Sequence, residues 1–230
     1  MQAVEATIAA AAEASGRPRS SVQLLAVSKT FPMEAVLEAM AAGQRAFGEN
    51  YLQEGVEKIA AVARTQPDTP VEWHFIGPIQ SNKTRPIATS FAWVHTVERL
   101  KIAQRLSEQR PPEMGPLNVC LQVNISGEAT KSGATPAELP ELARQVAALP
   151  NLTLRGLMAI PEAQTDPALQ RAAFARLRML ADALRAGGLT IDTLSMGMWA
   201  TWRRRLPKAR PSSVSAVRSS DRVITIKGST

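Results

Sequence analysis

The feature that most constrains the fold is a regular alternation of short apolar runs with longer amphipathic segments. Apolar runs with the length and composition of β-strands lie at 24–27, 45–48, 71–76, 92–95, 118–123, 152–157 and 190–194. Helix-like segments separate most of them. Strands that alternate with helices predict a parallel sheet, and about eight such units in roughly 200–250 residues make a (β/α)8 barrel. A doubly wound open α/β sheet fits the alternation nearly as well.

The alternation stops after Met198. Residues 199–222 contain two tryptophans, an Arg triplet and many Ser and Arg residues, and beyond them only Val223 to Ile226 resembles a strand. We therefore expect the last helix and strand of a barrel to be missing or aberrant. The chain would then consist of a barrel domain at 1–198 and a basic, poorly ordered tail at 199–230. This abrupt change of composition after Met198 is of the kind that a shift of the reading frame in the gene would produce.

The net charge of +7 belongs entirely to this tail. Residues 1–198 hold 19 basic and 19 acidic side chains, whereas residues 199–230 hold eight basic side chains against Asp221 alone. A neutral body offers no electrostatic surface for a phosphate backbone, so we do not expect a nucleic-acid partner. The Arg-rich tail with Trp202 keeps one alternative open, which is binding of nucleic acid or an acidic partner through the tail.

Several features indicate a cytoplasmic protein. No apolar run approaches the roughly 20 residues of a membrane span, and the N-terminal segment lacks the basic start of a secretory signal. The single cysteine, Cys120, excludes an intrachain disulfide. The two histidines, His74 and His95, have no Cys or carboxylate at ligand spacing, so we expect no metal site and expect both rings to pack at strand ends. We expect a monomer.

Polar residues follow several predicted strands, where parallel α/β folds gather their functional groups. Lys29 comes directly after an apolar run, so partial desolvation would lower its pKa and favour the neutral amine that forms an imine with an aldehyde. The alternative is a lysine that simply extends into solvent. The Asn50 amide suits a phenolate-like oxygen, but an Asn in a turn equally often caps the local backbone. Ser195 and Gly197 offer a hydroxyl and backbone N–H groups to a phosphate.

Taken together, these segments resemble the pyridoxal phosphate homeostasis proteins over about residues 1–198. The resemblance rests on a set of motifs in one order: Ala26-Val27-Ser28-Lys29-Thr30, Phe47-Gly48-Glu49-Asn50-Tyr51, Trp73-His74-Phe75-Ile76-Gly77-Pro78, Gln122-Val123-Asn124, Lys131-Ser132-Gly133, Gly156-Leu157-Met158-Ala159-Ile160 and Leu194-Ser195-Met196-Gly197-Met198. That family is a single-domain relative of the barrel half of alanine racemase, so the resemblance implies the (β/α)8 barrel.

The resemblance implies a protein that binds pyridoxal 5'-phosphate and helps to balance its free level and the levels of related amino acids, without established enzymatic turnover. Lys29 would form the imine, Asn50 would lie near the cofactor ring, and Met158 would belong to the pocket wall. Ser195, Met196 and Gly197 would lie at the phosphate end.

The sequence departs from the family after Met198. There the family continues with a Ser, an acidic helix and a last strand that supplies an Arg to the ring nitrogen and a Gly-Thr pair to the phosphate, whereas position 199 here is Trp. A pyridoxal-phosphate-dependent amino-acid racemase is the second alternative. It would need a further acid/base group, normally a Tyr from another domain, and the only tyrosine is Tyr51, beside Asn50.

Overall fold

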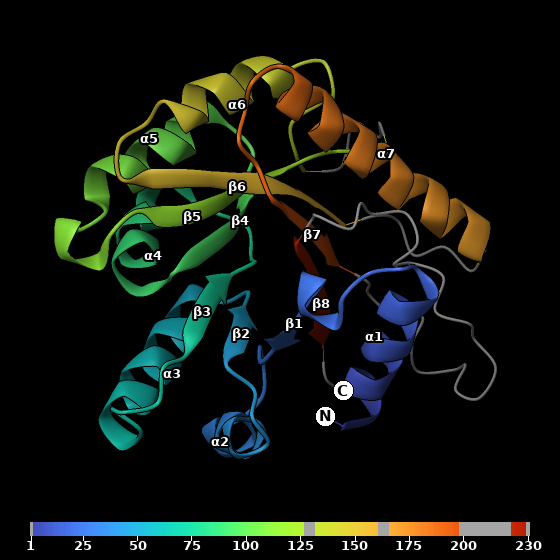
Figure 1. The fold of residues 1–230 in the computed structure, drawn as a ribbon. Helices are drawn as coiled ribbons and strands as arrows, with labels where there is room; N and C mark the ends of the chain where they lie inside the picture. Colours follow the sequence, from blue (N-terminus) through green and yellow to red (C-terminus); the bar gives the residue numbers. More distant parts are fainter. Residues whose placement is uncertain (1, 127–131, 161–165, 198–221, 229–230) are drawn as a thin grey trace.

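The protein is a parallel α/β barrel. The computed structural model describes residues 2–126, 132–160, 166–197 and 222–228. Within these residues eight parallel strands form a closed barrel, and each strand pairs with the next one in the sequence (Figure 1). The strands are β1 (Val22–Val27), β2 (Ala46–Glu49), β3 (Glu72–Phe75), β4 (Trp93–Val97), β5 (Leu117–Gln122), β6 (Leu152–Ala159), β7 (Thr193–Gly197) and β8 (Arg222–Gly228). The predicted (β/α)8 barrel is confirmed, and the doubly wound open sheet is excluded.

The barrel closes through β8, which corrects one expectation. We expected the last strand to be missing or aberrant, but Arg222–Gly228 pairs in parallel with β1 on one side and with β7 on the other. Six consecutive register pairs, from Val22↔Val223 to Val27↔Gly228, join β8 to β1. Neither β1 nor β7 is therefore left with an unpaired edge. Of the expected tail at 199–230, residues 199–221 and 229–230 lie outside the described residues, as does the region of the eighth helix.

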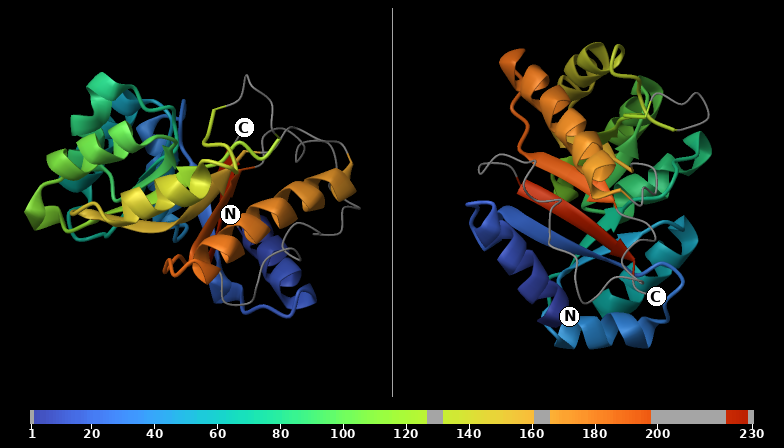
Figure 2. Two further views of the ribbon diagram at one scale, coloured as in Figure 1. Left: turned by 90° about the horizontal axis from the view of Figure 1, so that it is seen from above. Right: turned by 90° about the vertical axis from the view of Figure 1, so that its right-hand side faces the viewer.

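Helices surround the barrel on its outer side, as the views in Figure 2 show. They are α1 (Gln2–Ala14), α2 (Met33–Ala41), α3 (Leu52–Thr65), α4 (Thr84–Ser90), α5 (Leu100–Gln109), α6 (Leu139–Ala147) and α7 (Pro167–Ala186), with short 3-10 turns at Arg19–Ser21, Ser81–Lys83 and Pro112–Met114. No apolar periodicity in the sequence predicts the short helix α4 (Thr84–Ser90). Pro86 falls in the first turn of α4, where a proline removes no helical hydrogen bond. Within the described residues no helix is both long and apolar enough to cross a membrane.

The alternation of side chains along each strand separates two apolar layers. The larger layer lies between the strands and the helices and includes Leu194 and Met196. The smaller one, called the inner cluster below, lies inside the barrel and consists of Leu25, Val27, Ala46, Ile76, Trp93, Cys120 and Met158. The carboxyl end of the barrel, just beyond these inner residues, is where the predicted site residues follow their strands.

Candidate functional site

Lys29 lies in the turn that follows β1. The Ser28 N–H donates to the Gly48 carbonyl at 3.0 Å, so the β1–β2 pairing continues to the residue before Lys29. The next residue, Thr30, has a φ of 63°, in the left-handed region that non-glycine residues seldom adopt. Burial lowers the pKa of the half-buried Lys29 ammonium, in the direction that the sequence predicted. The turn therefore carries an amine that is easier to deprotonate than an exposed lysine.

A buried lysine on α3, Lys58, forms hydrogen bonds to this turn from the outer side of the barrel. The Lys58 ammonium donates to the Ser28 carbonyl at 2.6 Å, to Glu49 Oε1 at 2.9 Å and to Glu54 Oε1 at 2.6 Å. The Ser28 hydroxyl donates to the same Glu49 oxygen at 2.6 Å. Glu54 Oε1 also accepts the Thr30 N–H at 2.7 Å. The residues on both sides of Lys29 are thus connected to one ammonium.

Asn50 follows β2, the neighbour of β1, at the same end of the barrel. Its side-chain Oδ1 is buried and has no hydrogen-bond partner among the described residues. Its backbone packs tightly against Gly77, where a Cβ atom would lie only 2.0 Å from the Asn50 carbonyl oxygen. The Gly77 carbonyl in turn accepts the Thr96 hydroxyl at 2.6 Å. The Asn50 backbone is therefore fixed, while its amide keeps a hydrogen-bonding position for a ligand.

A continuous chain of hydrogen bonds crosses the barrel interior. Glu72 Oε1 lies 2.9 Å from His74 Nε2, His74 Nδ1 lies 2.9 Å from His95 Nε2, and His95 Nδ1 lies 2.7 Å from Ser195 Oγ. His74, His95 and Ser195 are completely buried, and the ring of Trp93 stacks on His74 at 5.4 Å. Burial alone would raise the pKa of the Glu72 carboxyl, but hydrogen bonding and the charge of His74 lower it to about 2. Burial, together with the charge of His74, lowers the pKa of His95.

The remaining predicted residues occupy different environments. Met158 is fully buried in the inner cluster and is the register partner of Ser195. The Ser195 hydroxyl bonds to His95, whereas the side chain of Met196 packs in the outer layer, so only the Met196 backbone can face the barrel interior. Gly197 ends β7, and β8 lies between β7 and β1. The structure thus brings Lys29 and Asn50 to neighbouring strand ends and Gly197 to the same end two strands away.

Two groups of functional interest were not found from the sequence. His74 and His95 were expected to pack at strand ends, but the chain that joins them to Ser195 spans 21 and then 100 residues of sequence, so no local motif reveals it. Lys58 carried one usable signal, the i,i+4 spacing to Glu54 on a predicted helix. Among the residues that the structure describes, no three or more His, Cys, Asp or Glu side chains are grouped to hold a metal ion.

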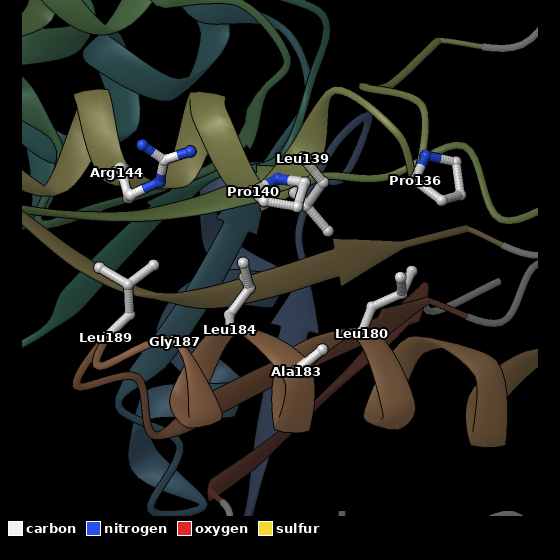
Figure 3. Close-up of a pocket in the computed structure, with 9 residues that line it drawn as sticks. All are labelled: Pro136, Leu139, Pro140, Arg144, Leu180, Ala183, Leu184, Gly187 and Leu189. Carbon is white, nitrogen blue, oxygen red and sulfur yellow. The ribbon is translucent and has the colours of Figure 1, made fainter.

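An apolar pocket lies away from this site, on the outer surface between α6 and α7 (Figure 3). Its walls are Pro136, Leu139, Pro140, Arg144, Leu180, Ala183, Leu184, Gly187 and Leu189. None of the predicted site residues lines it. The carboxyl end of the barrel remains the candidate site.

Comparison with known proteins agrees with this barrel. The family model described as "Alanine racemase, N-terminal domain" matches residues 1–218. The pyridoxal phosphate homeostasis protein of Pseudomonas aeruginosa is 65% identical over 195 residues, which are 85% of this chain and 82% of that protein. The protein of the same name from Vibrio cholerae is 60% identical over 195 residues, 85% of this chain and 83% of its own length.

A solved structure of a relative has the same fold. PipY of Synechococcus elongatus, in a structure with PLP bound, superposes with a TM-score of 0.75 at 33% identity and covers 96% of this chain and 97% of its own. Neither the racemase alternative nor nucleic-acid binding is supported by these relatives. This chain belongs to the family of the pyridoxal phosphate homeostasis proteins, which have the barrel of the alanine racemase N-terminal domain.

Proposed function

We propose that this chain binds pyridoxal 5'-phosphate through Lys29 and takes part in balancing the intracellular levels of the cofactor and of related amino acids. The observation that carries the proposal is the Lys29 turn, with an amine of lowered pKa at the carboxyl end of β1. The names of the relatives and the PLP in the PipY structure support the same ligand.

The described residues fit this cofactor. Lys29 would hold the cofactor, because its neutral amine is the group that could form a C=N bond with an aldehyde carbon, the carbonyl oxygen leaving as water. The buried Asn50 Oδ1, an acceptor without a hydrogen-bond partner among the described residues, suits a polar atom of the ring, and the close approach of Gly77 fixes the Asn50 backbone. Ser195, Met196 and Gly197 are proposed for the phosphate end, with Met158 in the pocket wall. When bound, the cofactor supplies an electrophilic carbon and an electron-withdrawing ring.

We propose binding without turnover. The only tyrosine of the chain is Tyr51, whose side chain is 56% exposed at the start of α3. An exposed residue there is poorly suited to act as the second acid/base group that racemisation requires. We further propose a cytoplasmic monomer, without a nucleic-acid or membrane partner. Its family-like barrel domain would be 1–198, and the divergent, basic segment 199–230 would supply the closing strand β8.

An absorption titration tests the proposal. Purified protein mixed with pyridoxal 5'-phosphate should develop the visible band of an imine, and borohydride should fix the cofactor on Lys29, as peptide mass analysis would show. Lys29→Ala should lose both signals, while Lys101→Ala, at an exposed position on α5, should retain them. Labelling spread over surface lysines, unchanged by Lys29→Ala, would refute specific binding.

A further inference from the structure

The turn that carries Lys29 is fixed by a buried charged group outside the barrel interior. Lys58 is 8% exposed and Glu49 is completely buried, so their ion pair at 2.9 Å is shielded from solvent. Both lie between the strands and α3. We name the group of Lys58, Glu49 and Glu54, with its bonds to Ser28 and Thr30, the Lys58 clamp.

We propose that Lys58 and Glu54 are positioning residues for Lys29, an inference that rests on the proposed function. Leu25 and Val27 face the barrel interior, so the alternation of β1 carries Lys29 to the interior side and Ser28 to the outer side. The clamp bonds the Ser28 carbonyl directly and the Thr30 N–H through Glu54. It therefore holds the backbone before and after Lys29, at Ser28 and at Thr30.

The backbone at Thr30 shows why such a clamp is needed. A φ of 63° costs energy for a β-branched residue, because its Cβ crowds the backbone. Without a bond to its N–H, the turn would relax toward conformations that aim Lys29 elsewhere. Glu54 Oε1 supplies that bond and is itself held by Lys58 at 2.6 Å. The clamp thus selects the conformation in which the amine lies at the barrel mouth.

The buried charges of Lys58 and Glu49 determine which variants can test the clamp without unfolding the protein. Burial raises the pKa of Glu49, whereas the bonds from Ser28 and Lys58 oppose that change. Removal of Lys58 alone would leave a buried, unpaired carboxylate and risk unfolding. The double variant Glu49→Gln with Lys58→Met removes both buried charges together. Glu54→Met removes the bond to Thr30 and the ion pair with Lys58, while Lys58 keeps Glu49 and the Ser28 carbonyl. The side chain of Glu54 is 29% exposed, so this variant should fold.

Two ligands separate positioning of Lys29 from general damage to the pocket. Pyridoxal 5'-phosphate can form the imine, whereas pyridoxine 5'-phosphate has the same ring and phosphate with an alcohol in place of the aldehyde. Loss of order in one backbone residue corresponds to a roughly tenfold weaker equilibrium. We expect Glu54→Met and the double variant to bind pyridoxal 5'-phosphate about tenfold more weakly and pyridoxine 5'-phosphate within about twofold of the wild type.

Two further variants serve as controls. Glu54→Gln keeps an oxygen for Thr30 and Lys58 and should restore imine formation. Glu57→Met, the same change on the exposed side of α3, should behave as the wild type. Equal weakening for both ligands would show a merely structural role and overturn the inference, as would unchanged affinity for pyridoxal 5'-phosphate. A wild-type protein that forms no imine on Lys29 would instead refute the proposed function itself.

Discussion

Replacement of Glu72 tests how the interior hydrogen-bond chain contributes to stability. Glu72 accepts bonds from His74 at 2.9 Å and from Gln23 at 3.2 Å, and its pKa lies at about 2 against an ordinary value of 4.5. Each pKa unit corresponds to about 1.4 kcal/mol, so the carboxylate would stabilise the fold by at most about 3 kcal/mol. Because the Glu72 side chain is 36% exposed, solvent screening should reduce this to about 1–2 kcal/mol.

The sign of the pH dependence follows from the lowered pKa. The unfolded chain takes up the Glu72 proton first as the pH falls, so the stabilisation is complete above about pH 4.5 and is lost as the pH falls toward about 2. Glu72→Gln should therefore lower the free energy of unfolding by about 1–2 kcal/mol at pH 7, and the difference should shrink steadily below pH 4.5. Urea unfolding at pH 7, 5, 4 and 3 measures it.

A control separates this effect from the histidines and from general acid sensitivity. The pKa of buried His95 is lowered from 6.5, so the unfolded chain is protonated first and stability also falls as the pH drops below about 6.5. That loss is expected both in the wild type and in Glu57→Gln, on the exposed side of α3. A Glu72→Gln difference that is zero at pH 7, or that stays constant from pH 7 to pH 3, would refute the reasoning.

Three further predictions concern two glycines in close contact with a neighbouring backbone and one buried thiol. Gly77→Ala would place a Cβ 2.0 Å from the Asn50 carbonyl, so it should weaken cofactor binding at least about tenfold in an absorption titration. Gly156→Ala would place a Cβ 1.7 Å from the Thr193 carbonyl of the paired strand and should lower the free energy of unfolding by more than about 3 kcal/mol in urea. Cys120 is completely buried, and burial raises the pKa of its thiol, so a thiol reagent should modify it only at the rate of unfolding.

The strands of the first 197 residues could be predicted because each contains a short, largely buried apolar run. The run at 24–27 became β1 (Val22–Val27) and the run at 152–157 became β6 (Leu152–Ala159), with errors only at the ends. The closing strand was expected to be missing or aberrant because the residues around Val223 to Ile226 are basic, whereas Arg222–Gly228 pairs regularly with both neighbouring strands. Its place depends instead on β1 and β7, whose free edges offer backbone partners to Arg222–Gly228 whatever the charge of the flanking residues.

The candidate site could be predicted only where its groups are local in sequence. Lys29 and Asn50 each follow an apolar run directly, and the lowered pKa of Lys29 agrees with that reasoning. The Lys58 clamp joins residues of β2 and α3 to the turn after β1, up to 30 positions away, so it appears only once α3 packs on the barrel. Side-chain alternation could still have placed Met196 outside the barrel, since it is adjacent to the inward-facing Ser195.

The interior chain also determines whether the Ser195 hydroxyl donates to His95 or accepts from it, which bears on the proposed role of Ser195 at the phosphate end. Above pH 4.5 the Glu72 carboxylate only accepts, so His74 Nε2 carries the hydrogen of that bond. If both imidazoles are neutral, His74 Nδ1 accepts from His95 Nε2, and His95 Nδ1 accepts from Ser195. The hydroxyl hydrogen is then used in the bond to His95, so only oxygen lone pairs remain, and these repel an anion. One added proton on either imidazole reverses the last bond and releases the hydroxyl hydrogen. Burial lowers the pKa of His95 and so disfavours the charge there, whereas a protonated His74 would pair with Glu72 at 2.9 Å. The proposed role of Ser195 at the phosphate end would therefore require this ion pair, because the hydroxyl can donate to an anion only in that state.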